Sequence, residues 1–121
     1  MHLEIVNKPY SSELAKVLIP ALGDFSEAIL SEIKRGESTI WEIGKTLYVV
    51  RIERDFQGLE MVIVAAVGSD IKQSAPRVVE QANNIGCYSI RFHSSRPGLV
   101  ELLGLPFRET ERVYRMNVGG E

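Results

Sequence analysis

The sequence has little cysteine and little histidine, and both scarcities exclude classes of protein. Its 121 residues include one cysteine and two histidines. A single thiol cannot close an intramolecular disulfide, whereas small secreted domains that depend on disulfides carry several. So few cysteines and histidines also make a zinc site an unfavourable reading. The sequence therefore predicts a fold held by its apolar core, with no metal, in a reducing compartment.

An excess of basic residues and a long apolar run are missing as well. The formal net charge is −2, whereas nucleic-acid-binding domains usually carry a positive excess because they neutralise phosphates. No apolar run reaches membrane-spanning length, and the first residues are too polar for a signal peptide. We therefore expect a cytoplasmic protein that does not engage a membrane and for which nucleic acid is an unlikely partner.

What remains is the composition of an ordinary globular domain. The chain is 45% hydrophobic and 25% charged, which is typical of folded proteins. It contains no repeat, low-complexity tract or linker. A domain of this length buries roughly two-thirds of the surface of its unfolded chain. We therefore expect one domain over residues 1–121.

Capping residues predict two helices in the first third of the chain. Ser11 or Ser12 can cap the first of them. Asp24 and Glu27 have the spacing of a capping box and predict that the second begins at Asp24. Gly36 is a natural end for that helix.

Apolar patterns predict a strand before these helices and four strands after them. The expected strands cover residues 3–6, 38–43, 46–54, 59–67 and 87–93. The run from Met61 to Val67 is unbroken and apolar, which is typical of a strand covered on both faces, so we place it at the centre of the sheet. In the fifth strand, alternation puts Tyr88, Ile90 and Phe92 on one side.

The last strands are separated by a predicted helix and followed by two more elements. Residues 68–73 read as a polar loop, and Ser74 is expected to cap a helix that carries Pro76 in its first turn and ends at Gly86. A short apolar helix is expected at 97–103 and a strand region at 107–118.

The resulting order, β-α-α-β-β-β-α-β-α-β, resembles the GNAT (N-acetyltransferase-like) fold. Residues 80–92 look like the helix of that family that ends in A-x-x-x-G before its fifth strand. Residues 102–107 resemble its L-G-F motif with two residues inserted, and residues 91–99 resemble small phage-encoded degenerate members. The resemblance implies an α/β (α+β) architecture, with a mixed central sheet and helices on both faces.

The resemblance also implies where acetyl-CoA would bind. In this family the fourth and fifth strands splay apart to pair with the pantetheine arm, and a Q/R-x-x-G-x-G/A loop holds the diphosphate through backbone N–H groups. Gly68 is the only glycine in the corresponding segment, Asp70 adds a negative charge, and Pro76 removes a donor. Acetyl-CoA is thus a weak expectation. The positions expected to contact it are Ala66, Val67, Gly68, Ser69, Lys72 and Ser74.

Candidates for catalysis are equally sparse. Many family members place a tyrosine four residues before the glycine of L-G-F, and Val100 occupies that position here. The remaining candidates are Glu60 as a base, His93 as an acid or base, and Tyr114 as an acid. Each has an ordinary alternative, such as a solvent-facing strand carboxylate or a hydrogen-bonded residue at a strand end.

Two further residues admit a functional and a structural reading. Cys87 and His93 are six residues apart on one expected strand, roughly 20 Å, which is too far for a nucleophile and its base. Cys87 is therefore expected to be a small packed residue. Trp41 is either an exposed anchor for a partner or part of the core.

The sequence favours a GNAT-like binding or structural protein of phage origin that has lost catalysis, a pseudoenzyme whose partner is a protein. The alternative is a divergent acetyl-CoA-dependent N-acetyltransferase that acts on a small amine. A third reading is a weak binder of nucleic acid or of a host protein, through Arg91 and Arg96.

Overall fold

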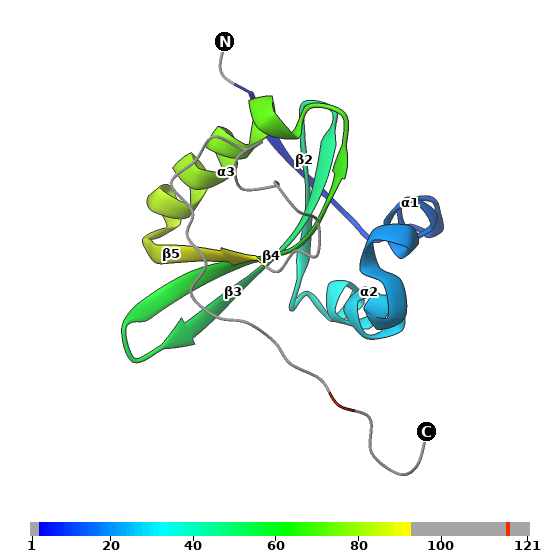
Figure 1. The fold of residues 1–121 in the computed structure, drawn as a ribbon, viewed down its shortest axis with the longest axis horizontal. Coiled ribbons are helices and arrows are strands. Elements are labelled where there is room, and N and C mark those ends of the chain that lie inside the picture. The colour runs from blue at the N-terminus through cyan, green and yellow to red at the C-terminus, as the bar shows by residue number, and fades with distance from the viewer. Residues whose placement is uncertain (1–2, 93–115, 117–121) are drawn as a thin grey trace.

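The computed structural model describes residues 3–92 and residue 116, and within them it forms a mixed sheet between helices (Figure 1). The strands follow one another across the sheet in the order β1-β2-β3-β4-β5. Neighbours from β1 to β4 are antiparallel, whereas β5 runs parallel to β4. The elements are β1 (Ile5–Lys8), α1 (Ser12–Leu22), a 3-10 turn (Gly23–Phe25), α2 (Ser26–Arg35), β2 (Thr39–Ile43), β3 (Thr46–Asp55), β4 (Gly58–Gly68), α3 (Ile71–Ile85) and β5 (Cys87–Phe92).

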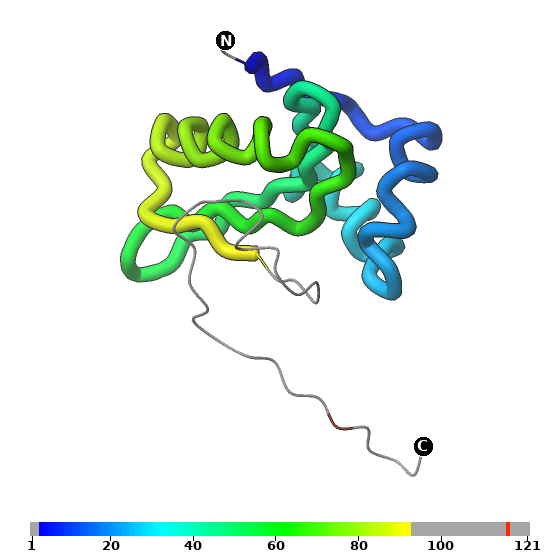
Figure 2. Tube along the Cα trace, turned by 45° about the horizontal axis from the view of Figure 1, so that its top comes forward, coloured from blue at the N-terminus to red at the C-terminus, as the bar shows by residue number. Residues whose placement is uncertain are grey.

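Helices cover both faces of this sheet, as the sequence predicted. Helices α1 and α2 lie against one face and α3 against the other (Figure 2). Leu18 and Ile29 pack with Val49 on the first face. Val78 packs with Met61 on the second. Each face thus has its own apolar core, and the prediction of an α/β (α+β) GNAT-like sheet is confirmed.

The start of α1 is as predicted, but the start of α2 is not. The Ser11 hydroxyl accepts a hydrogen bond from the Leu14 N–H at 3.1 Å and caps α1. Asp24 was expected to cap α2, yet it lies inside the 3-10 turn, and α2 begins at Ser26 without a side-chain cap. A capping residue needs extended backbone, which a residue within a helical turn does not have.

Strand β4 is interior, and its apolar run serves both cores, as predicted. Ala65 packs beneath α1 and α2, whereas Met61 packs beneath α3. The pairing with β3 shifts between Val49–Ala65 and Val50–Ile63, which leaves Val64 as a bulge. The middle position of the five described strands belongs to β3 rather than to β4.

Helix α3 begins earlier than predicted, so the expected loop at 68–73 and the expected cap at Ser74 are both wrong. Ile71 is the first residue of α3, and Ser74 and Pro76 lie inside the helix. Ser74 is 0% exposed, and its hydroxyl lies 2.6 Å from the hydroxyl of Tyr48 on β3. A serine bonded to the sheet beneath its helix does not need a cap position to satisfy its hydroxyl.

Strand β5 also carries a bulge, which corrects the predicted alternation. Leu59 pairs with Cys87 and Glu60 with Ser89, so Tyr88 is the extra residue. The Tyr88 hydroxyl donates a hydrogen bond of 2.5 Å to Asp55 at the end of β3. Tyr88 therefore does not share the packed side of Ile90.

Other predictions lie outside the described residues, namely the helix at 97–103 and the strand region at 107–118. The single-domain expectation for residues 1–121 stays a prediction. Among the described residues, every helix is too short or too polar to cross a bilayer.

The Tyr48–Ser74 contact leads to a prediction about stability. Ser74→Ala leaves the buried Tyr48 hydroxyl without its partner and should lower the free energy of unfolding by about 1–3 kcal/mol. Tyr48→Phe should cost less, about 0.5–1.5 kcal/mol, because Ser74 keeps its bond to the Ile71 carbonyl. Urea unfolding of both single variants and the double variant measures the coupling. The double variant should lose less than the sum, and additivity within about 0.3 kcal/mol would contradict the contact.

Candidate functional site

The short connection between β4 and α3 is the segment that the family resemblance assigns to the cofactor diphosphate. It is held against the turn between β2 and β3. The Asp70 carboxylate accepts hydrogen bonds from the Lys45 N–H at 2.9 Å and from the Thr46 hydroxyl at 2.5 Å. These bonds, that of Thr46 foremost, hold the pKa of Asp70 below its usual value. Asp70 is therefore an ionised group with internal partners.

Two glycines allow the connection and the turn to approach so closely. A Cβ at Gly68 would meet the Lys45 carbonyl oxygen and the Thr46 hydroxyl oxygen, each at 2.4 Å. A Cβ at Gly44 would lie 2.5 Å from Asp70 Oδ2, and Gly44 has a φ of +58°. We call Gly44, Lys45, Thr46, Gly68 and Asp70 the Asp70 clasp. The lone glycine of the expected cofactor loop thus has a structural reason to be glycine.

The expected cofactor contacts do not gather on one accessible surface. Ala66 packs against the core beneath α3, and Val67 packs against the core beneath α1 and α2. Ser74 is buried against Tyr48. Only Ser69 and Lys72 present exposed side chains beside the start of α3.

The clasp does not fit the diphosphate-binding loop that the resemblance implies. In such a loop glycines leave space for the ligand, whereas the space at Gly68 is filled by β3. An anion at the N-terminus of α3 would lie beside the ionised Asp70, which repels it. No catalytic step is therefore derived through acetyl-CoA.

The end of β4 is the other place where the resemblance expects a contact with the cofactor. Within the described residues, β5 pairs with β4 only as far as Ile63 and Phe92, while β4 continues to Gly68. Phe92 is also the last described residue of β5, and Val64 forms the bulge in the pairing of β4 with β3. The backbone from Val64 to Gly68 is the segment that the resemblance expects to meet a pantetheine arm.

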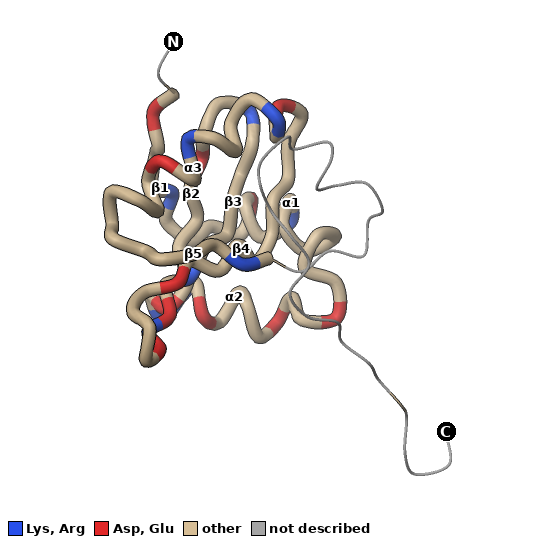
Figure 3. The backbone as a smooth tube through the Cα atoms, turned by 60° about the vertical axis from the view of Figure 1, so that its left-hand side comes forward, with Lys and Arg blue, Asp and Glu red and all other residues tan. Residues whose placement is uncertain are grey.

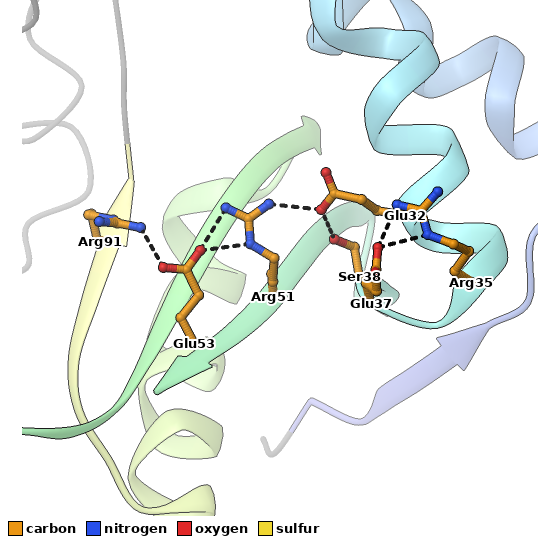
Figure 4. Close-up of polar contacts among 7 residues, drawn as sticks. All are labelled: Glu32, Arg35, Glu37, Ser38, Arg51, Glu53 and Arg91. Carbon is orange, nitrogen blue, oxygen red and sulfur yellow. Dashed lines mark hydrogen bonds and ion pairs between the residues drawn. The ribbon is translucent and has the colours of Figure 1, made fainter. Parts of the chain in front are cut away.

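On the face of the sheet next to α2, charged residues form an ion-pair ladder made of Glu32, Arg51, Glu53, Arg91 and Glu60. Figure 4 shows all of its members except Glu60. Arg51 lies 2.9 Å from Glu32 and 2.8 Å from Glu53. Arg91 of β5 lies 3.0 Å from Glu53 and 3.6 Å from Glu60. The ladder therefore joins α2, β3, β4 and β5 through alternating charges.

Glu60, the carboxylate expected as a base, and its neighbour Glu53 are both occupied in this ladder. Both oxygens of Glu53 are bound, one to Arg51 and one to Arg91. Glu60 accepts a hydrogen bond of 2.6 Å from the Ser89 hydroxyl and faces Arg91 with its other oxygen. A general base must have a free lone pair within reach of the proton it takes, and these contacts compete for it. His93 and Tyr114 lie outside the described residues.

The remaining sequence candidates have structural roles. Trp41 is buried in the core beneath α3, which decides between its two readings. Cys87 packs against the same core, and burial raises the pKa of its thiol, which is unfavourable for a nucleophile. Within residues 3–92, no group of three histidine, cysteine or acidic side chains lies close enough to hold a metal.

Sequence reasoning missed the two most extensive polar arrangements. Arg51 and Glu53 alternate with apolar residues along β3, which is the signal that the sequence holds for the ladder. The sequence holds no signal for their partners on α2 and β5, because residue spacing does not show how elements pack. Asp70 was interpreted only as a charge that would repel phosphate, and its bonds to Lys45 and Thr46 were not foreseen.

Comparisons with known proteins bear on the fold. No family model and no curated protein matches this sequence. A Trypanosoma brucei acetyltransferase has a similar structure, with a TM-score of 0.61, 20% identity, and coverage of 96% of this chain and 99% of that one. A probable acetyltransferase gives a TM-score of 0.68 at 12% identity, with coverage of 98% and 99%. An aminoglycoside N-acetyltransferase in complex with CoA gives 0.62 at 18% identity, with coverage of 97% and 95%. At these identities the likeness establishes architecture alone, and the chain has the fold of the GNAT acetyltransferases.

Proposed function

We propose that this chain is a GNAT-fold binding protein that does not transfer acetyl groups. The observation that carries the proposal is the Asp70 clasp. The residues at the position of the diphosphate loop bond to the β2–β3 turn, and the one glycine is needed for that contact. The segment is thus used to hold the fold together rather than to cradle a ligand.

The ion-pair ladder supports the same proposal. Acetyl transfer to an amine needs a group that removes a proton, and Glu53 and Glu60 are held by arginines and by Ser89. An ion pair at a partly exposed site contributes only about 0–1 kcal/mol to stability. Breaking one such contact therefore costs little free energy, so the ladder supports the proposal less strongly than the clasp does.

A protein is a better partner than a nucleic acid. Residues of both signs are interspersed along the described backbone, without a continuous stretch of one sign (Figure 3). Recognition of phosphates needs concentrated positive charge, and the net charge is −2. The cytoplasmic location and the phage origin stay predictions from the sequence.

A second candidate is a divergent acetyl-CoA-dependent N-acetyltransferase acting on a small amine. It is favoured by the acetyltransferases among the similar structures, which include one in complex with CoA and one with acetyl-CoA. It needs a different way of holding the diphosphate from the one that the family motif describes.

Calorimetry with acetyl-CoA separates the two candidates. We expect no binding tighter than about 100 µM, because the clasp repels the diphosphate. We also expect no release of free CoA thiol from acetyl-CoA with a panel of primary amines. Binding in the low micromolar range together with turnover would overturn the proposal. Binding that Lys72→Ala does not weaken would place the ligand away from the start of α3.

The clasp also predicts how stability depends on pH. The folded-state pKa of Asp70 is depressed, so its contribution is present above the unfolded-state pKa of about 3.9 and is lost as pH falls through the folded-state pKa. Asp70→Asn should therefore lower stability at neutral pH and flatten the loss of stability in acid. Thermal unfolding from pH 7 down to pH 2.5 measures this.

Asp24→Asn is the matched control for that experiment. Asp24 lies in the 3-10 turn and makes no hydrogen bond or ion pair within residues 3–92. Asp24→Asn should therefore give the same dependence of thermal stability on pH as the wild type. If Asp70→Asn and Asp24→Asn gave the same profile, the clasp would not contribute to stability.

A further inference from the structure

The hairpin between β3 and β4 ends in an aromatic side chain that is almost fully exposed. Phe56 is 97% exposed, more than any other large apolar residue described. Its hairpin projects from the body of the described structure, at the end where α3 finishes and β5 begins (Figures 1 and 2). An exposed phenylalanine side chain forgoes about 1.5–3 kcal/mol of burial free energy.

The turn itself gives no reason for a phenylalanine. The Asp55 carboxylate accepts hydrogen bonds from the N–H groups of Gln57 at 2.7 Å and Gly58 at 3.2 Å. Asp55 and Gly58 therefore fix the conformation of the turn, and the side chain at position 56 is free to be polar, as is usual in turns. The choice of an aromatic residue calls for a role outside this fold.

The tip is held in place before any partner arrives. The Tyr88 hydroxyl donates to Asp55 at 2.5 Å, which fastens the hairpin to the start of β5. That same bond raises the pKa of Tyr88 and lowers the pKa of Asp55, so the donor stays protonated and the acceptor stays charged. Because the backbone of the turn is already fixed, binding at the tip orders only the side chain of Phe56, which limits the loss of conformational entropy.

Further exposed apolar residues lie on the elements that meet at this end. Tyr88 is on β5, Ile85 is the last residue of α3, and Ile52 is on β3. The side chain of Arg54, next to the tip, is exposed and makes no hydrogen bond or ion pair within residues 3–92. The end of the hairpin therefore combines an aromatic knob with one unpaired positive charge.

We propose that the β3–β4 hairpin inserts Phe56 into an apolar pocket of a partner protein, and that an acidic side chain beside that pocket pairs with Arg54. The inference rests on the proposed function, since it names the surface through which a GNAT-fold binding protein would act. A phenylalanine buries about 150–250 Å², whereas a specific interface needs about 800 Å² from each partner. If two copies of the chain met tip to tip, each would present an exposed Phe56 and neither would offer an apolar pocket to receive it. A second copy in that arrangement is therefore not the partner that we propose.

Site-specific photo-crosslinking tests the surface. Phe56→benzoylphenylalanine places the crosslinker at the tip, and Val17→benzoylphenylalanine places it on α1 at another exposed apolar position. Irradiation in the native cells followed by mass spectrometry should give a defined protein adduct from position 56 that position 17 does not give. Absence of such an adduct would overturn the proposal.

The identified partner is then purified and titrated with variants of the full chain. Phe56→Ala should raise the Kd at least about tenfold, as expected for a buried aromatic anchor. Arg54→Glu should weaken binding more at low salt than at high salt. Val17→Ala is the control and should leave the Kd unchanged. A Kd for Phe56→Ala within twofold of the wild type would overturn the proposal.

Three other measurements keep the outcomes separate. Phe56→Ala should unfold at the wild-type temperature, since the side chain is 97% exposed and removing it uncovers little apolar surface. Cosedimentation with phosphatidylserine vesicles that depends on Phe56 would assign the knob to a membrane surface and overturn the protein partner. Turnover of acetyl-CoA would overturn the non-catalytic function while leaving the crosslink at position 56 in place.

Discussion

The hydrogen bonds of Asp70 fix the connection between β4 and α3, which is the segment where the resemblance expects a cofactor diphosphate. One carboxylate binds the Lys45 N–H and the Thr46 hydroxyl, and it joins the turn between β2 and β3 to the start of α3. Gly44 and Gly68 supply the space for that contact. Just beneath it, Tyr48 and Ser74 share a buried hydroxyl pair, so the first turn of α3 is tied to β3 at two levels. The beginning of α3 is therefore a structural joint.

On the face of the sheet next to α2, the elements are joined by ion pairs, whereas α3 is joined to β3 by short hydrogen bonds. Arg51 and Arg91 alternate with three carboxylates from α2, β3 and β4. Partly exposed ion pairs add little to stability individually, but each fixes the direction of a long side chain. The consequence is chemical: the carboxylates on this face have defined partners, and a reaction that used one of them would first have to release it.

How far the sequence predicts the structure depends on whether the controlling contact is local. The Ser11 cap and the glycine ends of α2 and α3 were predicted because those signals lie within a few residues of the element they control. The starts of α2 and α3 were mispredicted because Asp24 and Ser74 follow capping patterns, yet one lies in a 3-10 turn and the other bonds to β3. The bulges at Val64 and Tyr88 arise from strand pairing, which no single strand encodes.

For the candidate site, the sequence identified the segment and its unusual glycine content, but the partners of Asp70 come from a turn 24 and 25 residues away.

The same carboxylate is unsuited to serving both the fold and a diphosphate. If Asp70 stayed in the clasp while a diphosphate bound at the start of α3, the two negative groups would lie side by side, and their repulsion would offset the attraction of the helix N-terminus. If Asp70 turned away, the Lys45 N–H and the Thr46 hydroxyl would lose the acceptor that now satisfies them. The first route weakens anion binding by repulsion, and the second weakens it through the loss of two stabilising hydrogen bonds. The fold of the acetyltransferases is therefore combined here with a start of α3 whose acidic group is held by internal contacts, whereas the most exposed large apolar side chain among the described residues, Phe56, lies on the β3–β4 hairpin.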